Sequence, residues 1–536
     1  MLTRRVVNSV LLITAVFALS ALPAPAQEQI PARVEILRSI AHGVTPPLRS
    51  LPPQAAVPLL PVIPLRAPGG NGRNGGGGGG SWIDPDLKNP SATSSSSLAI
   101  SRSWDGIPAN GSIPPDTNLA VSPSQVVQIA NTEYAVWDKL GNVLIAPTAI
   151  HGIFSALADA PAPANMCASS DGGDPIVLYD QIAGRWFITQ LEYTSSFQTN
   201  LICTAVSQTA DATGSYNVYA WNFGNNLPDY PKFGVWPDAY YMTANMFRNA
   251  STFVGAGACA FDRAAMVAGA ASPAAQCFQG GTGVYSLLPT DLDGSTLPPG
   301  GEPNFLLMFT ASRGAGNTLN LYRFHVDWSD SANSNVAGPI GIGAGSYHEA
   351  CGGGACVPQA GTSQQLDTLG DRLMYRLSYR NFGSYESLAV NHSVQVSSSS
   401  KQVGIRWYEI RNPNGSPSLA QQATYSPDGT IYRWMGSIAQ DKLGNMAVGY
   451  SLSSSSLNPS IYFAVRTPTD TQFGSEVRVI DGTGSQSFYS RWGDYSSMAV
   501  DPADDCTFWY TTEYLTSNGS FNWKTRIASF KFSSCQ

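Results

Sequence analysis

Short apolar runs recur along the chain in pairs, each pair divided by a polar turn, and six copies of this pattern are evident. The copies begin at Asn118, Pro175, Lys232, Gln365, Ser437 and Ser496. Val, Ile, Tyr, Phe, Trp and Thr crowd the apolar runs, whereas Asp, Pro, Gly and Asn fill the turns, as is typical of β-hairpins. Because helical periodicity is absent there, each copy predicts two antiparallel strands.

The copies recur at a nearly constant spacing. Their turn-entry residues, Ser122, Asp180, Trp236, Asp367, Asp441 and Asp501, are 58, 56, 131, 74 and 60 residues apart. The interval of 131 residues contains a weaker copy from Asn304, which makes seven units. A strand-only repeat of this length predicts an all-β fold, a seven-bladed β-propeller, with six blades as the alternative. Units of about 63 residues exceed the about 40 to 50 that four strands need, so we expect long loops that carry binding surfaces.

The chain begins with segments unlike the repeat. Residues 1–26 combine two arginines, an apolar stretch and an Ala24-Pro25-Ala26 cleavage pattern, which indicates a secretory signal peptide. Residues 27–80 are rich in Pro and end in a Gly-rich run, which predicts a disordered spacer or propeptide, although Glu28 to Gly43 is compatible with a short helix. Residues 81–536 are then expected to form the propeller domain. We expect a secreted or periplasmic monomer.

Cysteine usage agrees with export. The chain has eight cysteines, and an even number in an exported chain favours disulfide bonds. Eight cysteines allow 105 pairings. Pairing between neighbours is the simplest, and it joins Cys167 to Cys203, Cys259 to Cys277, Cys351 to Cys356, and Cys506 to Cys535. The last pair would tie the final hairpin to the end of the chain.

Charged residues are sparse, and this limits the classes of partner that the chain is expected to bind. Charged residues make up 12% of the chain, the formal net charge is −7, and no Lys/Arg cluster suits a phosphate backbone. Beyond the signal peptide no apolar run is long enough to span a bilayer. Nucleic acid and membranes are therefore not expected as partners, and an extracellular glycan or a cell-surface protein is.

Acidic residues recur at one end of the predicted hairpins. Asp116, Asp174, Asp229 and Asp494 precede first strands, and the dipeptide Glu-Tyr follows second strands at Glu133, Glu192 and Glu513. In a blade, the start of the first strand and the end of the second lie on the same face of the ring. The pattern predicts a patch of carboxylates whose mutual repulsion separates their pKa values, as general acid/base cleavage of a glycosidic bond requires.

These acids have two other interpretations. Each Asp can simply close an Asx-turn, and each Glu-Tyr can be the inherited end of a duplicated hairpin. The carboxylates can also bind Ca²⁺, although the sequence contains no local pattern that specifies metal ligands. No cofactor is therefore expected, with calcium as the exception that the acids allow.

Arginine and aromatic residues flank the predicted patch. Arg491, Trp492 and Tyr495 stand beside Asp494, and Arg433 and Trp434 open another first strand. Aromatic rings next to carboxylates and arginine suit a saccharide site, because sugar rings present apolar faces and hydroxyl edges. Most aromatic residues are instead expected to fill the space between blades. Trp434 and Trp492 are the exceptions, since each follows an arginine directly.

The blocks around IPPDTNLAVSPSQVV, DYPKFGVWPDAYY, QQLDTLGDRLMYR and RWGDYSSMAVDPAD resemble those of a family of exported bacterial proteins without an assigned activity, from about residue 105 to the end. The chain is also similar in fold pattern to sialidase-like and other glycan-active propellers. The sialidase resemblance would nominate Arg185, Arg433 and Arg491 as an arginine triad, with Tyr495 as nucleophile and Glu513 as its partner. GDPIVLYD resembles the opening of propeller arabinanases and xylosidases, which implies a general base at Asp174.

The sequence as a whole predicts a secreted propeller that acts on extracellular polysaccharide, with glycoside hydrolysis as the favoured activity. In that hypothesis Asp494 or Asp174 is the base, Glu513 or Glu192 the acid, and Asp116 and Glu133 complete the patch. Arg491, Trp492, Tyr495, Arg433 and Trp434 would hold the sugar. The alternatives are a non-catalytic carbohydrate-binding or protein-binding propeller and a structural Ca²⁺ site.

Overall fold

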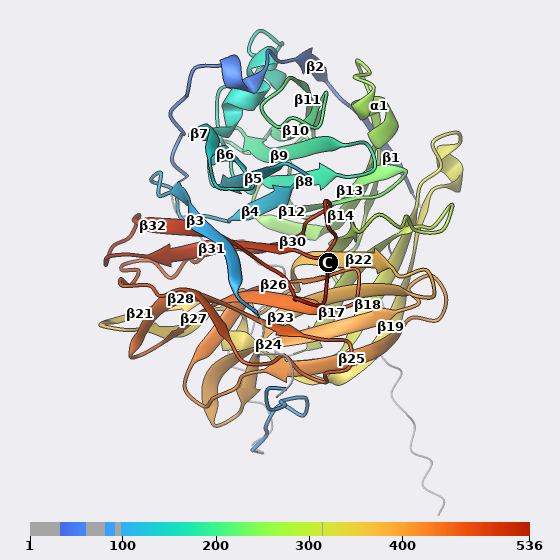
Figure 1. Cartoon of the computed structure of the whole chain (residues 1–536). Coiled ribbons are helices and arrows are strands. Elements are labelled where there is room, and N and C mark those ends of the chain that lie inside the picture. Colours follow the sequence, from blue (N-terminus) through green and yellow to red (C-terminus); the bar gives the residue numbers. More distant parts are fainter. Residues whose placement is uncertain (1–29, 31–32, 60–80, 92–97, 313–314) are drawn as a thin grey trace, which may run out of the picture.

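The computed structural model describes residue 30 and residues 33–59, 81–91, 98–312 and 315–536. These residues form an almost entirely β structure in a propeller-like arrangement (Figure 1). The expected signal peptide and Gly-rich run lie outside the described residues. Within the described ranges, no helix is both long and apolar enough to cross a membrane.

Most strands of the described chain group into antiparallel sets of four, and two of these sets are joined through the parallel pair β16–β22 into one eight-stranded sheet. The first three are β4 (Asn118–Val121), β5 (Gln125–Ala130), β6 (Glu133–Asp138) and β7 (Val143–Ala149); β8 (Ile176–Asp180), β9 (Arg185–Tyr193), β10 (Asn200–Ser207) and β11 (Tyr216–Asn222); and β12 (Asn226–Val235), β13 (Ala239–Arg248), β14 (Thr252–Asp262) and β15 (Ala274–Gln279). The next two are β16 (Leu288–Asp293), β17 (Asn304–Ser312), β18 (Ala315–His325) and β19 (Asn335–Glu349); and β22 (Met374–Asn381), β23 (Glu386–Ser397), β24 (Ser400–Arg411) and β25 (Ser418–Tyr425). The last two are β26 (Tyr432–Gln440), β27 (Met446–Ser454), β28 (Leu457–Arg466) and β29 (Val477–Ile480); and β30 (Ser497–Val500), β31 (Phe508–Leu515), β32 (Trp523–Phe530) and β3 (Ile100–Pro108).

Helices and a small hairpin occupy the connections. The helices are η1 (Leu48–Ser50), η3 (Ile150–Leu157), η4 (Ala164–Ala168), α1 (Arg263–Val267), η5 (Ser331–Asn333) and η6 (Ala350–Gly353). Strands β20 (Ala355–Gln359) and β21 (Thr362–Asp367) pair only with each other in the sheets described.

The first strands of the seven sets follow one another around a closed ring. β4 contacts β8, β8 contacts β12, β12 contacts β16, β16 pairs in parallel with β22, β22 contacts β26, β26 contacts β30, and β30 contacts β4. β4 is buried throughout, because neighbouring sets cover both of its faces. All these strands start at one end of the ring, so residues that precede them lie close together.

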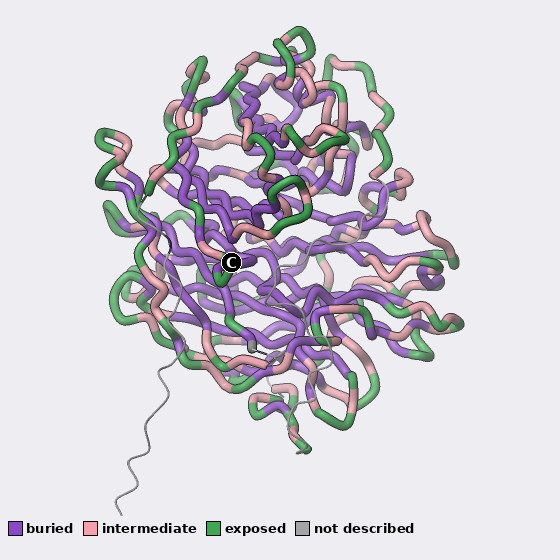
Figure 2. Tube along the Cα trace, turned by 180° about the vertical axis from the view of Figure 1, so that it is seen from behind, coloured by how far each residue is buried: buried purple, intermediate pink, exposed green. Residues whose placement is uncertain are grey.

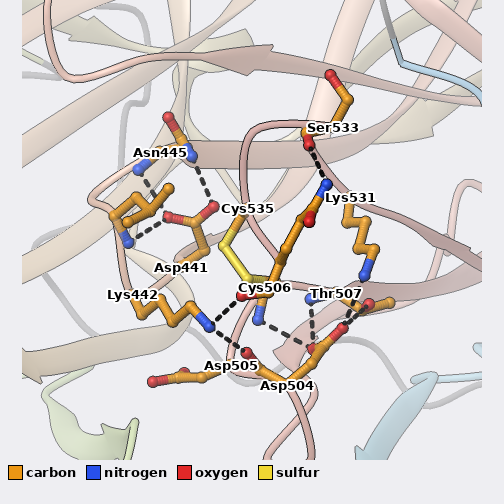
Figure 3. The surroundings of a disulfide bond; sticks show 12 residues. Asp441, Lys442, Asn445, Asp504, Asp505, Cys506, Thr507, Lys531, Ser533 and Cys535 are labelled. Carbon is orange, nitrogen blue, oxygen red and sulfur yellow. Dashed lines mark hydrogen bonds and ion pairs between the residues drawn. A yellow bond between two sulfur atoms is a disulfide. The ribbon is translucent and has the colours of Figure 1, made fainter.

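Two devices close the ring at its ends. β3, from the N-terminal part of the chain, pairs with β32 and completes the last set. The Cys506–Cys535 disulfide then ties the β30–β31 connection to the last residues, where Lys442 Nζ also donates to a main-chain carboxylate oxygen of Gln536 at 2.7 Å (Figure 3). Closure through distant segments satisfies strand edges that would otherwise be exposed.

Apolar side chains fill the space between neighbouring sheets. Val127 of β5 and Ile188 of β9 belong to one such cluster. Between two other sets, the rings of Phe463 and Phe530 stack with centroids 3.6 Å apart. Figure 2 shows the buried strands and the exposed turns that join them. Each fully buried side chain of this size contributes about 1.5 to 3 kcal/mol, so the core stabilises each set against the next.

The predicted hairpins are found at five of the six strong copies, those from Asn118, Pro175, Lys232, Ser437 and Ser496. The copy from Gln365 is not a hairpin: β21 pairs with β20, while β22 pairs with β16 and β23. The weaker copy from Asn304 forms the second and third strands of its set, β17 and β18. Apolar runs alone did not reveal which neighbouring strand each strand pairs with.

The described N-terminal residues are packed against the ring. In place of the short helix expected between Glu28 and Gly43, β1 (Glu35–Arg38) pairs with β15 and β2 (Ala41–Val44) pairs with β11. The segment then continues past the first set, where the Leu59 amide donates to Ser112 Oγ at 2.9 Å. Free sheet edges accept a fifth strand, so a Pro-rich composition did not prevent this segment from ordering.

The four neighbour pairings of cysteines are present, at Cys167–Cys203, Cys259–Cys277, Cys351–Cys356 and Cys506–Cys535. All eight cysteines lie in the described residues, and none is free. Each disulfide joins residues that are close in sequence, as expected when a crosslink stays within one set or joins it to an adjacent connection.

Candidate functional site

The first strands bring four aspartates to one end of the ring. Asp116 and Asp174 each precede a first strand by two residues, Asp494 precedes β30 by three, and Asp229 lies within β12. The Asp494 amide donates to Asp116 Oδ1 at 2.7 Å, which joins the last set to the first. The Tyr230 amide donates to Asp174 Oδ2 at 3.0 Å, which joins the second set to the third. We call these four residues the acid cluster.

An unusual backbone conformation positions the cluster. Asp116, Asp174 and Tyr230 have φ values of 48°, 49° and 56°, in the left-handed region that non-glycine residues adopt at a cost. β12 also has a register shift between Asp229 and Lys232. Such irregularities turn a side chain away from the regular pleat and are enriched beside functional sites.

Burial and mutual repulsion perturb the acid cluster. Burial, together with the charges of Asp494 and Asp174, raises the pKa of Asp116 well above its usual value. Burial and the charge of Asp174 raise the pKa of Asp229 to about 8. Burial also raises the pKa of Asp494, although Arg491 opposes this shift. Burial and mutual repulsion therefore favour the protonated form of these acids, whereas the charge of Arg491 favours the ionised form of Asp494.

Three cations lie among the aspartates. Arg491 Nη2 forms an ion pair of 2.9 Å with Asp494. Lys232 Nζ lies 3.6 Å from the ring centroid of Tyr230 and 3.9 Å from that of Tyr495, and burial lowers its pKa to about 8. The Arg372 guanidinium also lies over the Tyr230 ring, 4.6 Å from its centroid, and is ion-paired with Asp371.

Arg491 retains unused hydrogen-bonding capacity. Its Nε and Nη1 atoms are buried and make no hydrogen bond in the described structure. Buried donors usually have a partner, because leaving one unpaired costs about 1 to 3 kcal/mol. Two unpaired donor nitrogens on the residue that is ion-paired with Asp494 indicate a place where a ligand or water oxygen would bind.

The three glutamates do not all lie where the sequence pattern placed them. Glu192 Oε1 accepts from the Gly172 amide at 2.9 Å, and Glu513 Oε1 accepts from the Gly493 amide at 2.6 Å. Burial raises the pKa of Glu192 to about 8 and that of Glu513 to about 7. Both carboxyls thus brace the segments that carry Asp174 and Asp494.

Glu133 has a different position. It begins β6, a third strand, rather than ending a second strand, and it is half-buried. Asn131 takes the place beside the first aspartate, and its Nδ2 donates to Asp116 Oδ2 at 2.7 Å. The shared Glu-Tyr dipeptide was therefore misleading in this set, because the two-residue turn at 131–132 places it at the start of the third strand and not at the end of the second.

Three of the aromatic and arginine candidates are buried between neighbouring sets. Trp434 and Trp492 are buried, with ring centroids 5.7 Å apart, so they fill the wall between sets and do not offer faces to a sugar. Arg433 is buried in ion pairs with Asp428 and Glu476. The tryptophans and Arg433 were expected to hold a sugar, but they are buried. The reason is that a side chain near the start of a first strand can also face the neighbouring set.

Tyr495 and Arg185 complete the sequence candidates. Tyr495 is buried beneath the acid cluster, and its hydroxyl donates to the Pro175 carbonyl at 3.0 Å. Arg185 Nη1 donates to carbonyls of its own turn, those of Ala183 and Gly184. Arg185 and Arg433 therefore have partners of their own, and of the nominated arginine triad only Arg491 is ion-paired within the acid cluster.

Sequence reasoning missed Lys232 and Arg372, whereas Tyr230 was among the aromatic residues expected to fill the space between blades. The signal available for Lys232 was the DYPK segment, in which a basic residue follows the recurring aspartate. Arg372 gave no comparable signal. Among the described residues, no group of three His, Cys, Asp or Glu side chains has a geometry that could hold a metal ion.

Comparisons with known proteins add little. No protein-family description and no curated protein matches the chain. An exo-β-1,3-galactanase from Phanerochaete chrysosporium, crystallised with galactose, is 12% identical with a TM-score of 0.28, over 85% of this chain and 97% of the other.

Two further structures are similar in the same limited sense. An α-L-arabinanase from Penicillium chrysogenum, in complex with arabinobiose, is 8% identical with a TM-score of 0.33, over 85% of this chain and 100% of the other. A subtype N10 neuraminidase-like protein from a little yellow-shouldered bat influenza virus is 10% identical with a TM-score of 0.33, over 69% and 99%. Likenesses this weak carry no argument about the site.

Proposed function

We propose that the chain is a secreted seven-bladed β-propeller whose acid cluster cleaves glycosidic bonds in an extracellular polysaccharide. The seven sets around the ring of first strands support the blade count. The signal-peptide pattern and the four disulfides support export to an oxidising compartment.

One observation carries the proposed chemistry: Asp229, with a pKa of about 8, shares the acid cluster with Asp494, which is ion-paired to Arg491. Asp229 is protonated at neutral pH and can give a proton to a leaving oxygen. The ion pair favours the charged form of Asp494, which can act as base or nucleophile. Asp174, half-buried beside both, is the alternative base.

In this proposal Glu192 and Glu513 are positioning residues instead of the acids that the sequence suggested. Their carboxyls accept hydrogen bonds from Gly172 and Gly493, and both side chains are only 1% exposed. Substrate would reach Asp174 and Asp229, which are half-buried, before it reached either glutamate. The free Nε and Nη1 donors of Arg491 would bind hydroxyl or carboxylate oxygens of the sugar.

The test measures turnover of a panel of glycans, namely arabinan, β-1,3-galactan, xylan and ulvan. Release of reducing ends is the signal that is recorded. Asp229→Asn and Asp494→Asn should each lower the rate on the active glycan by about 100-fold or more, since general acid/base groups contribute at least that much. Asp138→Asn, at the half-buried last residue of the third strand β6, is the matched control and should leave the rate unchanged. Full activity in both cluster variants would refute the mechanism.

The second candidate is a non-catalytic glycan-binding or protein-binding propeller. It is favoured by the burial of Asp116 and Asp494, which are only 1% and 8% exposed and so are poorly accessible to a polymer. Glycan binding that survives both Asn substitutions, with no turnover by the wild-type protein, would establish this alternative. If a chelator lowers the melting midpoint, the hypothesis of a structural calcium ion is supported, because a bound ion stabilises the native state.

A further inference from the structure

Phe488 is an exposed aromatic residue on the segment that leads into the acid cluster. Its side chain is 85% exposed, the highest value among the large hydrophobic residues of the described chain. Its φ of 70° lies in the left-handed region, which is rare for a bulky residue. Phe488 precedes Arg491 by three residues, and three residues of chain span at most about 10 Å.

The backbone on both sides of Phe488 is held in place. The Gln486 amide donates to Gln359 Oε1 at 2.8 Å, and the Ser487 amide donates to the Gly519 carbonyl at 2.9 Å. On the other side, the Ser490 carbonyl accepts from the Asp367 amide at 2.8 Å. The exposure of the ring is therefore a property of an anchored loop.

The loop is also closed on itself. Gln486 Nε2 donates to the carbonyls of Tyr489 and Arg491, so the loop curls around one buried side chain with Phe488 at its tip. Tyr489, next along the chain, packs edge-on against Phe521 with centroids 5.6 Å apart. Phe488 remains without an aromatic partner of this kind in the described structure, although its neighbour has one.

Two unfavourable features thus coincide at one residue. An exposed phenyl ring forgoes the free energy of burial, and a left-handed backbone conformation costs about 1 to 3 kcal/mol. Anchored outliers of this kind are retained where the surrounding structure holds them for a purpose. The same loop ends at Arg491, whose free donors already indicate a place for a ligand.

We propose that Phe488 is a stacking platform for a sugar ring of the polysaccharide, at a subsite next to the one that the acid cluster occupies. This inference rests on the proposed function for the identity of the ligand. An aromatic face packs against the apolar face of a sugar, while Arg491 takes oxygens of the adjoining unit. The platform would strengthen binding of a chain of several sugars and contribute nothing to a single sugar unit.

Affinity electrophoresis tests this directly, with gels that contain arabinan, β-1,3-galactan, xylan or ulvan. We expect at least one of these polymers to retard the wild-type protein. Phe488→Ala should weaken that retardation about tenfold, equivalent to about 1.4 kcal/mol. Phe488→Tyr, which keeps the ring, should retain most of it. Leu140→Ala removes another exposed apolar side chain, 65% exposed in the turn between β6 and β7, and should have no effect.

The outcomes separate this inference from the proposed function. Retardation that depends on Phe488, in a protein without turnover, would support the platform and overturn the hydrolase. Turnover of a polymer with the same KM in wild type and Phe488→Ala would overturn the platform and leave the hydrolase. Failure of all four polymers to retard the wild type would also overturn the platform. Circular dichroism of each variant confirms that the fold is intact.

Discussion

The two ends of the ring of first strands treat buried charge differently. At the end where the strands start, the four aspartates of the acid cluster share Arg491, Lys232 and Arg372, and in the part of the chain that the structure describes only Asp494 among them forms an ion pair. Toward the other end, Arg376 of β22 forms ion pairs with Asp291 and Asp293, near the end of β16, and donates to the Met498 carbonyl at 3.1 Å. We call this second group the arginine plug.

The difference teaches which charges hold the fold together and which are free for chemistry. In the arginine plug, each of the three nitrogens of Arg376 has a partner, two carboxylates and a carbonyl, and Arg380 forms a similar ion pair with Asp505. In the acid cluster, Arg491 has two unused donors, and Lys232 faces the rings of two tyrosines. Saturated groups stabilise a closed structure, whereas unsaturated ones can bind and exchange protons.

Replacing the central arginine at each end should show the difference between the two ends most strongly. Arg376→Met leaves two buried carboxylates unpaired, and we expect it to lower the free energy of unfolding by about 3 to 5 kcal/mol. Arg491→Met leaves acids that can take up protons, so it should cost less than half as much and yet abolish glycan turnover. Urea unfolding at pH 7 measures both variants. Equal losses of stability would show that the two ends do not differ.

The bracing glutamates should make the acid-cluster end sensitive to pH. Glu192 has a pKa of about 8 in the folded protein and about 4.3 when unfolded, so between these values the folded state holds a proton that the unfolded state has lost. Stability from this group is therefore complete below about pH 4 and falls as pH rises toward 8, by about 1.4 kcal/mol per pH unit.

Glu192→Gln should remove that slope, because the amide does not titrate. The measurement is the free energy of unfolding at pH 5, 6, 7 and 8 for wild type and variant. Glu35→Gln, on the exposed strand β1, serves as the matched control and should keep the wild-type profile. A variant whose profile still falls as steeply would assign the pH dependence to other groups.

Two glycines allow the smallest and most selective comparison. Gly173, next to Asp174, has a φ of 97°, and a Cβ there would lie 2.8 Å from Leu59 Cδ2. Gly294, beside the arginine plug, has a φ of 79°, and a Cβ there would meet Arg380 Nη1. Replacing either with Ala should cost about 1 to 2 kcal/mol of stability.

Only Gly173→Ala should also reduce turnover, since it displaces the segment that carries Asp174. Thermal melts and initial rates on the active glycan measure the two effects separately. Loss of activity in Gly294→Ala as well would mean that the arginine plug and the acid cluster are mechanically coupled.

Much of the local structure could be predicted from the sequence. Alternating apolar and polar positions define a hairpin within about twenty residues, and five of the six strong copies are hairpins. The disulfides followed from proximity in sequence for the same reason. The exception, the copy from Gln365, shows the limit: β22 pairs with β16, a partner 87 residues away (Thr290 with Leu377) that its own pattern could not reveal.

For the candidate site too, the sequence predicted some features and not others. The recurring aspartates marked one end of the blades, and Asp116, Asp174 and Asp494 do meet there. Whether a neighbour such as Trp434 or Glu192 faces solvent or an adjoining set depends on contacts between blades, which no local pattern encodes. The same holds for Lys232, whose place beneath two tyrosines requires β12 and the segment before β30 to be adjacent.

The sequence by itself therefore determined the strand-rich repeat, the hairpins and the neighbouring cysteine pairs, because backbone hydrogen bonding and apolar alternation act over short stretches of chain. The tertiary structure decided which acids share one environment, which arginine keeps free donors, and how Pro-rich N-terminal residues become edge strands. Those outcomes depend on burial and on charges contributed by distant segments, and both exist only once the ring has closed.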